Sequence, residues 1–237
     1  MSVMRALVVA HDHTSPLGPI GEQLARRGYE LEHFLAIPRE HFDAPGIAVD
    51  FPDFTAYDAV VVLGAIWSVY DDATIGAWVH DEIAQVRAAD TAGVPVLGIC
   101  FGGQVLAAAH GGSVERAAHA EIGWTDVHSL DESVVPRGPW FQWHFDRWVT
   151  PPDAELLASN GAAPQAFALR RNLAVQFHPE LTGASLLGWL ENGGYAGARA
   201  AGFDPGMMLV ETDQLQADAA RRAALLVDGF LDRIAAR

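Results

Sequence analysis

The single cysteine of the chain, Cys100, stands in a pattern typical of a catalytic nucleophile. An apolar run ends just before it, a helical pattern begins just after it, and glycines occupy positions 98 and 102. Glycines there permit the tight strand-to-helix turn of a nucleophile elbow, because larger side chains would collide. A lone cysteine is otherwise most often an inert core residue. The flanking glycines therefore favour a nucleophile at the carboxyl end of a sheet.

The helix expected to follow Cys100 would assist its chemistry. A helix N-terminus favours negative charge, so it favours the thiolate over the thiol. The free N–H groups of its first turn can bind the oxyanion that forms when a thiolate attacks a carbonyl group. The N–H of Phe101 is the natural donor, because it directly follows the nucleophile.

The sequence QFHPE at 176–180 supplies a base and a carboxylate at the end of another apolar run. The intervening proline favours extended backbone before it, so His178 and Glu180 would point the same way at strand-like spacing. His178 can then exchange a proton with the thiol and the leaving group, while Glu180 holds the other ring nitrogen. Taken alone, the segment could equally be a turn that caps the following helix. Together with Cys100 it predicts a Cys-His-Glu triad.

Alternating apolar and amphipathic stretches predict the framework that must position these residues. Strand-like runs occupy 5–10, 29–37, 58–64 and 95–99, and helices are expected at 20–27, at 75–89 and from 103 onward. This order predicts an α/β fold whose doubly wound, mostly parallel sheet has helices on both faces.

The second half of the chain has a different pattern of apolar and turn-forming residues. From about residue 121, short strand-like pieces are separated by Gly and Pro, and residues 170–172 fit a hairpin turn, which predicts an appended antiparallel section. Closing helices are expected at 183–191 and 214–235, with an unassigned Gly- and Ala-rich stretch at 192–213. We expect a single domain over 1–237, with a C-terminal helical extension at about 192–237.

Composition excludes several classes of protein. With 237 residues, half of them hydrophobic, the chain can bury a large core. The net charge of −15 disfavours nucleic-acid and anionic-membrane partners. No apolar run of about 18 residues or signal-peptide pattern is present, and a single cysteine allows no intrachain disulfide. These features predict a cytoplasmic protein.

Four segments in order resemble class I, or triad, glutamine amidotransferases. GICFGGQ at 98–104 and QFHPE at 176–180 resemble the paired signature of that family. Residues 57–72 resemble the strand and oxyanion loop of its GMP-synthetase-like members, and EIGW at 121–124 is similar to a sequence of stand-alone members. The resemblance covers roughly 57–190 and is specific when all four segments occur together. It implies a class I glutamine amidotransferase fold and a cysteine-dependent amidohydrolase without a cofactor.

The resemblance also assigns roles to eight residues. They are the triad Cys100, His178 and Glu180, the oxyanion-hole backbone at Gly64 and Phe101, and the substrate contacts Gln104, Phe145 and Asp146, the last two through their main chain.

The oxyanion loop departs from the pattern of the family. The chain has Gly64-Ala65 where many members have Gly-Gly, and Ile66 where many have proline. Alanine makes a peptide flip that needs positive φ harder. This departure favours a hole that is already formed in the free protein.

Three functions remain open from the sequence. In the first, the chain hydrolyses glutamine, and the ammonia goes to a separate synthetase or is a plain product, because no phosphate-binding GxxxxGK[ST] loop is present. In the second, the same chemistry acts on a γ-glutamyl amine or peptide. In the third, the chain is a non-catalytic binding module that kept the fold, although all three triad residue types are present. The substrate is a small molecule in the first two.

Other polar motifs have simpler interpretations. His11-Asp12-His13 matches no compact zinc pattern, so we expect a polar loop and no metal site. The acid pairs at 71–72 and 81–82 fit helix starts, where they complement the dipole. The alternating aromatics at 140–148 are expected mainly to cover a sheet, with His144 as their most notable polar member.

Overall fold

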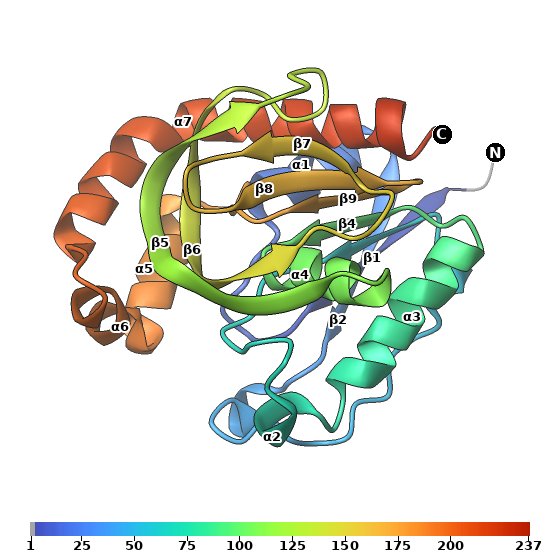
Figure 1. The fold of residues 1–237 in the computed structure, drawn as a ribbon, viewed down its shortest axis with the longest axis horizontal. Coiled ribbons are helices and arrows are strands. Elements are labelled where there is room, and N and C mark those ends of the chain that lie inside the picture. The colour runs from blue at the N-terminus through green and yellow to red at the C-terminus, as the bar shows by residue number, and fades with distance from the viewer. Residues whose placement is uncertain (1–2) are drawn as a thin grey trace.

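The structure, a computed structural model that describes residues 3–237, is built on one nine-stranded sheet (Figure 1). The strand order is β2-β1-β3-β4-β9-β8-β7-β5-β6. The strands are β1 (Met4–Ala10), β2 (Tyr29–Leu35), β3 (Ala59–Val62), β4 (Val96–Ile99), β5 (Ser113–Ser129), β6 (Gly138–Val149), β7 (Glu155–Ser159), β8 (Pro164–Leu169) and β9 (Asn172–Val175).

Strands β2, β1, β3, β4 and β9 form the parallel half of the sheet. Every residue of β3, β4 and β9 is buried, as expected for parallel strands covered on both faces. Successive side chains of β1 enter different cores: Leu7 and Val9 belong to one hydrophobic cluster and Val8 to the other. The prediction of a doubly wound, mostly parallel sheet is confirmed.

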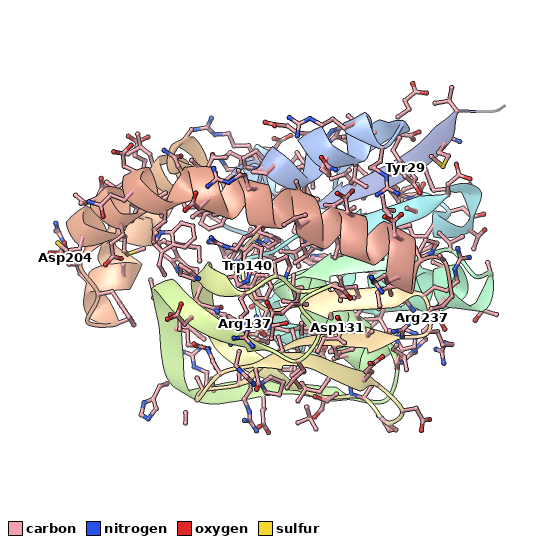
Figure 2. The ribbon with its side chains drawn as sticks, turned by 90° about the horizontal axis from the view of Figure 1, so that it is seen from above. Tyr29, Asp131, Arg137, Trp140, Asp204 and Arg237 are labelled. Atoms are coloured by element: carbon pink, nitrogen blue, oxygen red, sulfur yellow. The ribbon has the colours of Figure 1, made fainter. Side chains whose placement is uncertain are left out.

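Helices cover both faces of this half. The helices are α1 (Gly18–Arg26), α2 (Asp72–Ile75), α3 (Val79–Thr91), α4 (Phe101–Ala109), α5 (Gly183–Trp189), α6 (Tyr195–Ala200) and α7 (Pro205–Gly229), with 3-10 turns η1 (Arg39–His41) and η2 (Phe54–Ala56) and π turns η3 (Leu190–Gly194) and η4 (Phe230–Ile234). Buried residues of α3 and α4 share one core, and those of α1 and α7 share the other. Figure 2 shows α7 running lengthwise from Asp204 toward Arg237, above Trp140.

The antiparallel section continues the same sheet from β9. A hairpin joins β8 to β9 through Arg170, whose φ is 54°, so the predicted turn at 170–172 is confirmed. Strands β5 and β6 pair over most of their length and form a long curved arm (Figure 1). The sequence predicted strands only from about residue 121, whereas β5 begins at Ser113. Its first part was missed because it is polar and largely exposed, and its pairing with β6 holds it extended.

Three predicted helices have different bounds in the structure. The helix expected at 75–89 is divided into α2 and α3, because Trp78 has non-helical dihedrals (φ −143°, ψ −26°). The helix expected at 183–191 runs into η3, where Gly193 has φ 100°. The last helix begins at Pro205, not 214, after an N-cap in which Asp204 accepts a hydrogen bond from the Gly206 N–H. Within residues 3–237, no helix is long and apolar enough to cross a bilayer.

Candidate active site

Cys100 occupies the turn between β4 and α4 and has a strained backbone, with φ 52° and ψ −105°. The turn is tight because main chains approach closely: a Cβ on Gly98 would lie 2.5 Å from the Gly102 oxygen, and one on Gly102 would lie 2.1 Å from the Val62 oxygen. Only glycine fits at these two positions. The strand-to-helix turn predicted around Cys100 is therefore present, and it directs the side chain into a pocket.

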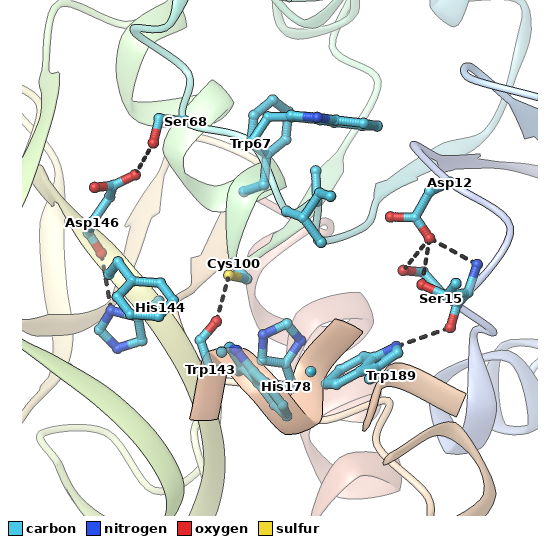
Figure 3. A pocket seen from close by; sticks show the side chains of 18 of the residues that line it. Asp12, Ser15, Trp67, Ser68, Cys100, Trp143, His144, Asp146, His178 and Trp189 are labelled. Atoms are coloured by element: carbon cyan, nitrogen blue, oxygen red, sulfur yellow. Dashed lines mark hydrogen bonds between the residues drawn. The ribbon is translucent and has the colours of Figure 1, made fainter. Parts of the chain in front are cut away.

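That pocket has a volume of about 370 Å³ and lies at the carboxyl ends of the parallel strands. The Cys100 sulfur contacts its wall on two sides, 4.0 Å from the Trp143 carbonyl oxygen and 3.6 Å from Nε2 of Gln176 (Figure 3). His178 lines the same pocket.

His178 and Glu180 form a buried pair. Nδ1 of His178 lies 2.7 Å from Oε1 of Glu180, and both side chains are almost fully buried. Burial opposes a charge on the ring, but the Glu180 carboxylate and the Cys100 sulfur outweigh it and hold the pKa of His178 well above its ordinary value. Nε2 is buried and has no hydrogen-bond partner in the part of the chain that the structure describes. This nitrogen is therefore free to exchange a proton inside the pocket.

Gly64 lies against both Cys100 and His178. A Cβ built on Gly64 would be 3.1 Å from Cε1 of His178 and 3.7 Å from Cβ of Cys100. The Phe101 N–H begins α4, so it has no acceptor within the helix. Residues 64, 100, 101 and 178 all line the pocket. The structure thus brings the predicted oxyanion backbone and two predicted triad members together.

The three predicted substrate contacts also line the pocket, and polar groups of two of them, Gln104 and Asp146, have partners in the protein. Nε2 of Gln104 lies 3.4 Å from the Asp146 carbonyl oxygen and 3.4 Å from Oε1 of Gln176. The same Asp146 oxygen is 2.9 Å from Nδ1 of His144. The Asp146 carbonyl group is consequently held in place at the wall of the pocket.

The Asp146 carboxylate ties this wall to the oxyanion loop, which sequence reasoning did not foresee. It accepts hydrogen bonds from Ser68 and, at 2.9 Å, from the Tyr70 hydroxyl, and Arg116 approaches to 3.6 Å. No local motif signals the contacts of Asp146 with Ser68 and Tyr70, because these residues lie 78 and 76 positions from it.

Glu121, the first residue of the EIGW segment, is the centre of a second polar network. Its carboxylate accepts hydrogen bonds from Asn160 (2.5 Å) and Gln165 (2.9 Å), and it lies 3.1 Å from Nε2 of His144. Because His144 contacts the Asp146 oxygen, Glu121 supports the pocket wall from behind. The resemblance singled out this segment without revealing that role.

His11 and Glu82 lie where the sequence predicted, in the loop after β1 and in the first turn of α3. The sequence did not reveal that both are fully buried, with the Glu82 carboxylate 2.9 Å from Nε2 of His11. Asp71 caps its helix by accepting from the Thr74 N–H. Within residues 3–237 no three His, Cys, Asp or Glu side chains gather in a group that could hold a metal ion.

The aromatic cluster at 140–148 divides into two groups. Trp140, Phe141 and Trp148 are buried, as predicted for residues that cover a sheet. Trp143 and Phe145 instead line the pocket. Residues of η3 and the start of α6 line it as well, so the Gly-rich stretch left unassigned by the sequence forms part of the wall.

The chain matches one family model over most of its length. This model, "Glutamine amidotransferase class-I", matches residues 18–191. The chain is 36% identical over 141 residues to a GMP synthase (glutamine-hydrolyzing) of Methylobacillus flagellatus, covering 52% of this chain but 25% of that protein. It is 29% identical over 168 residues to a GMP synthase (glutamine-hydrolyzing) subunit of Sulfolobus acidocaldarius, covering 65% and 86%. The chain thus spans about a quarter of the longer relative.

Solved structures share the fold over nearly the whole chain. A glutamine amidotransferase from Thermotoga maritima superposes with a TM-score of 0.81 at 23% identity, covering 97% of this chain and 99% of that one. A glutamine amidotransferase from Methylobacillus flagellatus gives a TM-score of 0.83 at 22% identity, covering 98% and 95%. At this identity the likeness establishes the fold.

Proposed function

The chain belongs to the class I glutamine amidotransferase family, and from this we propose that it hydrolyses the γ-carboxamide of glutamine or a γ-glutamyl amide through a thioester on Cys100. The observation that carries the proposal is the convergence of three features in one pocket. These are the strained Cys100, the buried His178–Glu180 pair and the backbone at Gly64.

In the first half of the reaction the Cys100 thiolate attacks the γ-carbonyl carbon. The carbonyl oxygen becomes an oxyanion, which the N–H of Phe101 and the Gly64–Ala65 backbone would stabilise. His178, protonated at Nε2, then gives its proton to the amide nitrogen, and the carbon–nitrogen bond breaks. Ammonia or an amine leaves, and a γ-glutamyl thioester remains on the sulfur.

The second half reverses these roles with water as the nucleophile. Nε2 of His178, now unprotonated, takes a proton from water as it attacks the thioester. The carbon–sulfur bond breaks, glutamate is released, and the thiolate and imidazolium are restored. Glu180 holds Nδ1–H throughout, so the ring keeps its orientation in both halves.

A direct experiment follows the acyl-enzyme and the products together. Purified protein is mixed with glutamine, quenched with acid and analysed by mass spectrometry, while ammonia and glutamate are measured in parallel. We expect a γ-glutamyl adduct on the peptide that contains Cys100 and equal amounts of the two products. Glutamate release by the Cys100→Ala variant at the wild-type rate would contradict the mechanism.

One feature of the pocket favours a γ-glutamyl amine over glutamine itself. The Trp189 ring packs 4.9 Å from the His178 ring, on the histidine that must protonate the leaving group, and its Nε1 donates to the Thr14 oxygen. Nearby, Oδ1 of Asp12 accepts from the N–H and hydroxyl of Thr14, while its other oxygen faces the pocket (Figure 3). An aromatic wall with a carboxylate suits an amine with an apolar or cationic tail.

Kinetics on a panel of substrates distinguish glutamine from γ-glutamyl amines as the preferred substrate. If the aromatic wall and Asp12 bind the amine part of the substrate, kcat/KM should be higher for γ-glutamyl derivatives of alkyl amines or diamines than for glutamine. The Asp12→Asn variant should lose this preference for diamines and retain activity on glutamine. Equal effects of Asp12→Asn on all substrates would assign Asp12 a structural role and leave glutamine as the substrate.

An ammonia-supplying role for a separate ATP-dependent synthetase is the remaining alternative. It is supported by the Sulfolobus relative, whose name designates one subunit of a synthase. Co-purification of a synthetase that uses the released ammonia would favour it.

A further inference from the structure

A buried ion pair lies directly behind the oxyanion loop. His11 follows the end of β1 and Glu82 lies in the first turn of α3; both side chains are fully buried. Nε2 of His11 is 2.9 and 3.1 Å from the two carboxylate oxygens of Glu82. Nδ1 of His11 is 3.2 Å from the carbonyl oxygen of Gly64.

These contacts determine the charge of the ring. An ionised Glu82 carboxylate and a backbone carbonyl oxygen are both acceptors, so beside them both ring nitrogens of His11 donate, as in the imidazolium. Among the residues that the structure describes, His11 is also the only hydrogen-bond partner of the Glu82 carboxylate. A buried carboxylate needs such a countercharge. Burial opposes the charge on His11, but Glu82 outweighs it and raises the pKa of the ring above its ordinary value.

His11 contacts both parts of the predicted oxyanion hole. Besides its bond to the Gly64 oxygen, its ring packs edge-on against the Phe101 ring at 4.7 Å and stacks on the Trp78 ring at 5.7 Å. These aromatic contacts hold the ring in one orientation. In a trans peptide the C=O and N–H point in opposite directions, so fixing the Gly64 oxygen also fixes the Ala65 N–H, directed away from His11.

We propose that His11, held by Glu82, is a positioning residue that locks the Gly64–Ala65 peptide in the orientation required to bind the oxyanion. The proposal rests on the function proposed above. In this arrangement a charge-assisted hydrogen bond, and not local backbone preference alone, holds the peptide.

Two variants test separately whether the loop needs the hydrogen bond from His11 and whether it needs the charge on the His11 ring. In Glu82→Gln, neutral His11 can still donate from Nδ1 to Gly64 while Nε2 accepts from the glutamine amide, so the bond to the loop survives without the charge. The double variant His11→Phe/Glu82→Met keeps the packing and removes the bond, and apolar replacement of a buried pair is generally tolerated. His110→Phe is the matched control, because His110 also contacts a backbone oxygen (Leu106, 2.9 Å) and a carboxylate (Asp90, 3.3 Å), away from the pocket.

The expected kinetic result is a selective loss in kcat. The double variant should lower kcat about tenfold or more, up to the roughly 10²- to 10³-fold loss that follows complete removal of an oxyanion donor. Its KM should change little, and its rate of Cys100 alkylation by iodoacetamide should be unchanged, because alkylation forms no oxyanion. Glu82→Gln should lose less, and His110→Phe should keep the wild-type kcat. Wild-type kcat in a folded double variant, or an equal loss of alkylation, would overturn the proposal.

Two further readouts do not depend on turnover. Imidazole nitrogen NMR should show both nitrogens of His11 still protonated just above pH about 6.5, where a free imidazole is mostly neutral, and one nitrogen protonated in Glu82→Gln. Hydrogen exchange of residues 63–68 should become faster in the double variant but not in His110→Phe. A neutral His11, or unchanged exchange, contradicts the proposal. Absence of wild-type turnover on every γ-glutamyl amide would instead contradict the proposed function.

Discussion

Oε1 of Glu180 lies 2.7 Å from Nδ1 of His178, while Oε2 of the same carboxylate is buried without a hydrogen-bond partner among residues 3–237. The carboxylate is therefore committed to one ring nitrogen and leaves Nε2 for proton transfer. This relationship predicts an order of effects on amide hydrolysis. Cys100→Ala and His178→Ala should lower kcat by about 10⁴-fold or more, and Glu180→Ala should lower it less, because Glu180 orients and does not transfer the proton.

Steady-state ammonia release, with circular dichroism to show that each variant folds, measures this order. Because His178→Ala keeps the thiol and Cys100→Ala removes it, the pair also tests whether Cys100 is the nucleophile. Substantial turnover by purified Cys100→Ala protein would exclude the triad.

The raised pKa of His178 predicts how stability depends on pH. The folded state holds this proton more tightly than the unfolded chain, whose histidines titrate near about 6.5. The contribution to stability is therefore fully present below pH about 6.5 and is lost as the pH rises through the folded-state pKa. The free energy of unfolding, measured in urea from pH 6 to 10, should fall over this range. The free energy of unfolding of the Glu180→Gln variant should fall less steeply. A wild-type protein that gains stability across this range would contradict the assignment.

The setting of Cys100 predicts thiolate reactivity near neutral pH. The sulfur lies beside the start of α4 and shares the pocket with the His178 ring. Both features favour reaction at the sulfur, so iodoacetamide should alkylate Cys100 faster than it alkylates a free cysteine at the same neutral pH. His178→Ala should slow this alkylation. A wild-type rate no faster than that of free cysteine, and unchanged in His178→Ala, would return Cys100 to the class of inert thiols.

A substitution at Gly64 tests whether the close approach of this residue to His178 is needed for catalysis. A methyl group at this position would press on His178, since its Cβ would lie 3.1 Å from Cε1 of that ring. The ring must then shift by a few tenths of an ångström. We expect Gly64→Ala to fold but to lower kcat, by less than the roughly 10²-fold loss that a misplacement of about 1 Å would cause. Gly161→Ala is the matched control, because a Cβ there meets nothing within 4 Å, and it should leave kcat unchanged. Wild-type kcat for Gly64→Ala would show that the contact is not needed.

Local motifs predicted those parts of the site whose functional residues lie close together in the sequence. The turn at Cys100 and the pairing of His178 with Glu180 depend on spacings of two residues, which a sequence displays directly. The His11–Glu82 pair could not be found in this way, because its members are 71 residues apart and meet only through the packing of α3 against the sheet. Each residue alone has an ordinary local interpretation.

The same limit explains the differences in the fold. Strands β3 and β4 are buried on both faces, so their apolar runs were easily recognised. The first part of β5 is polar and becomes a strand by pairing with β6. The start of α7 was predicted too late because it directly follows the Gly- and Ala-rich residues 192–203. The sequence did not predict segments whose secondary structure depends on pairing or packing with distant segments and not on their own residue pattern.

The last prediction concerns whether the isolated chain is active. An oxyanion hole that a partner protein completes requires a loop that can change its orientation. Here the Gly64 carbonyl is already bonded to His11, and the loop is also tied through Ser68 to Asp146. The hole should therefore be formed in the free chain, and purified protein should release glutamate from a γ-glutamyl amide without a partner. Assaying the pure chain, and then the chain with cell extract and ATP, measures the difference. Stimulation of about a hundredfold, equivalent to about 2.7 kcal/mol of transition-state stabilisation, would show that a partner completes the site and that the free chain is not the working enzyme.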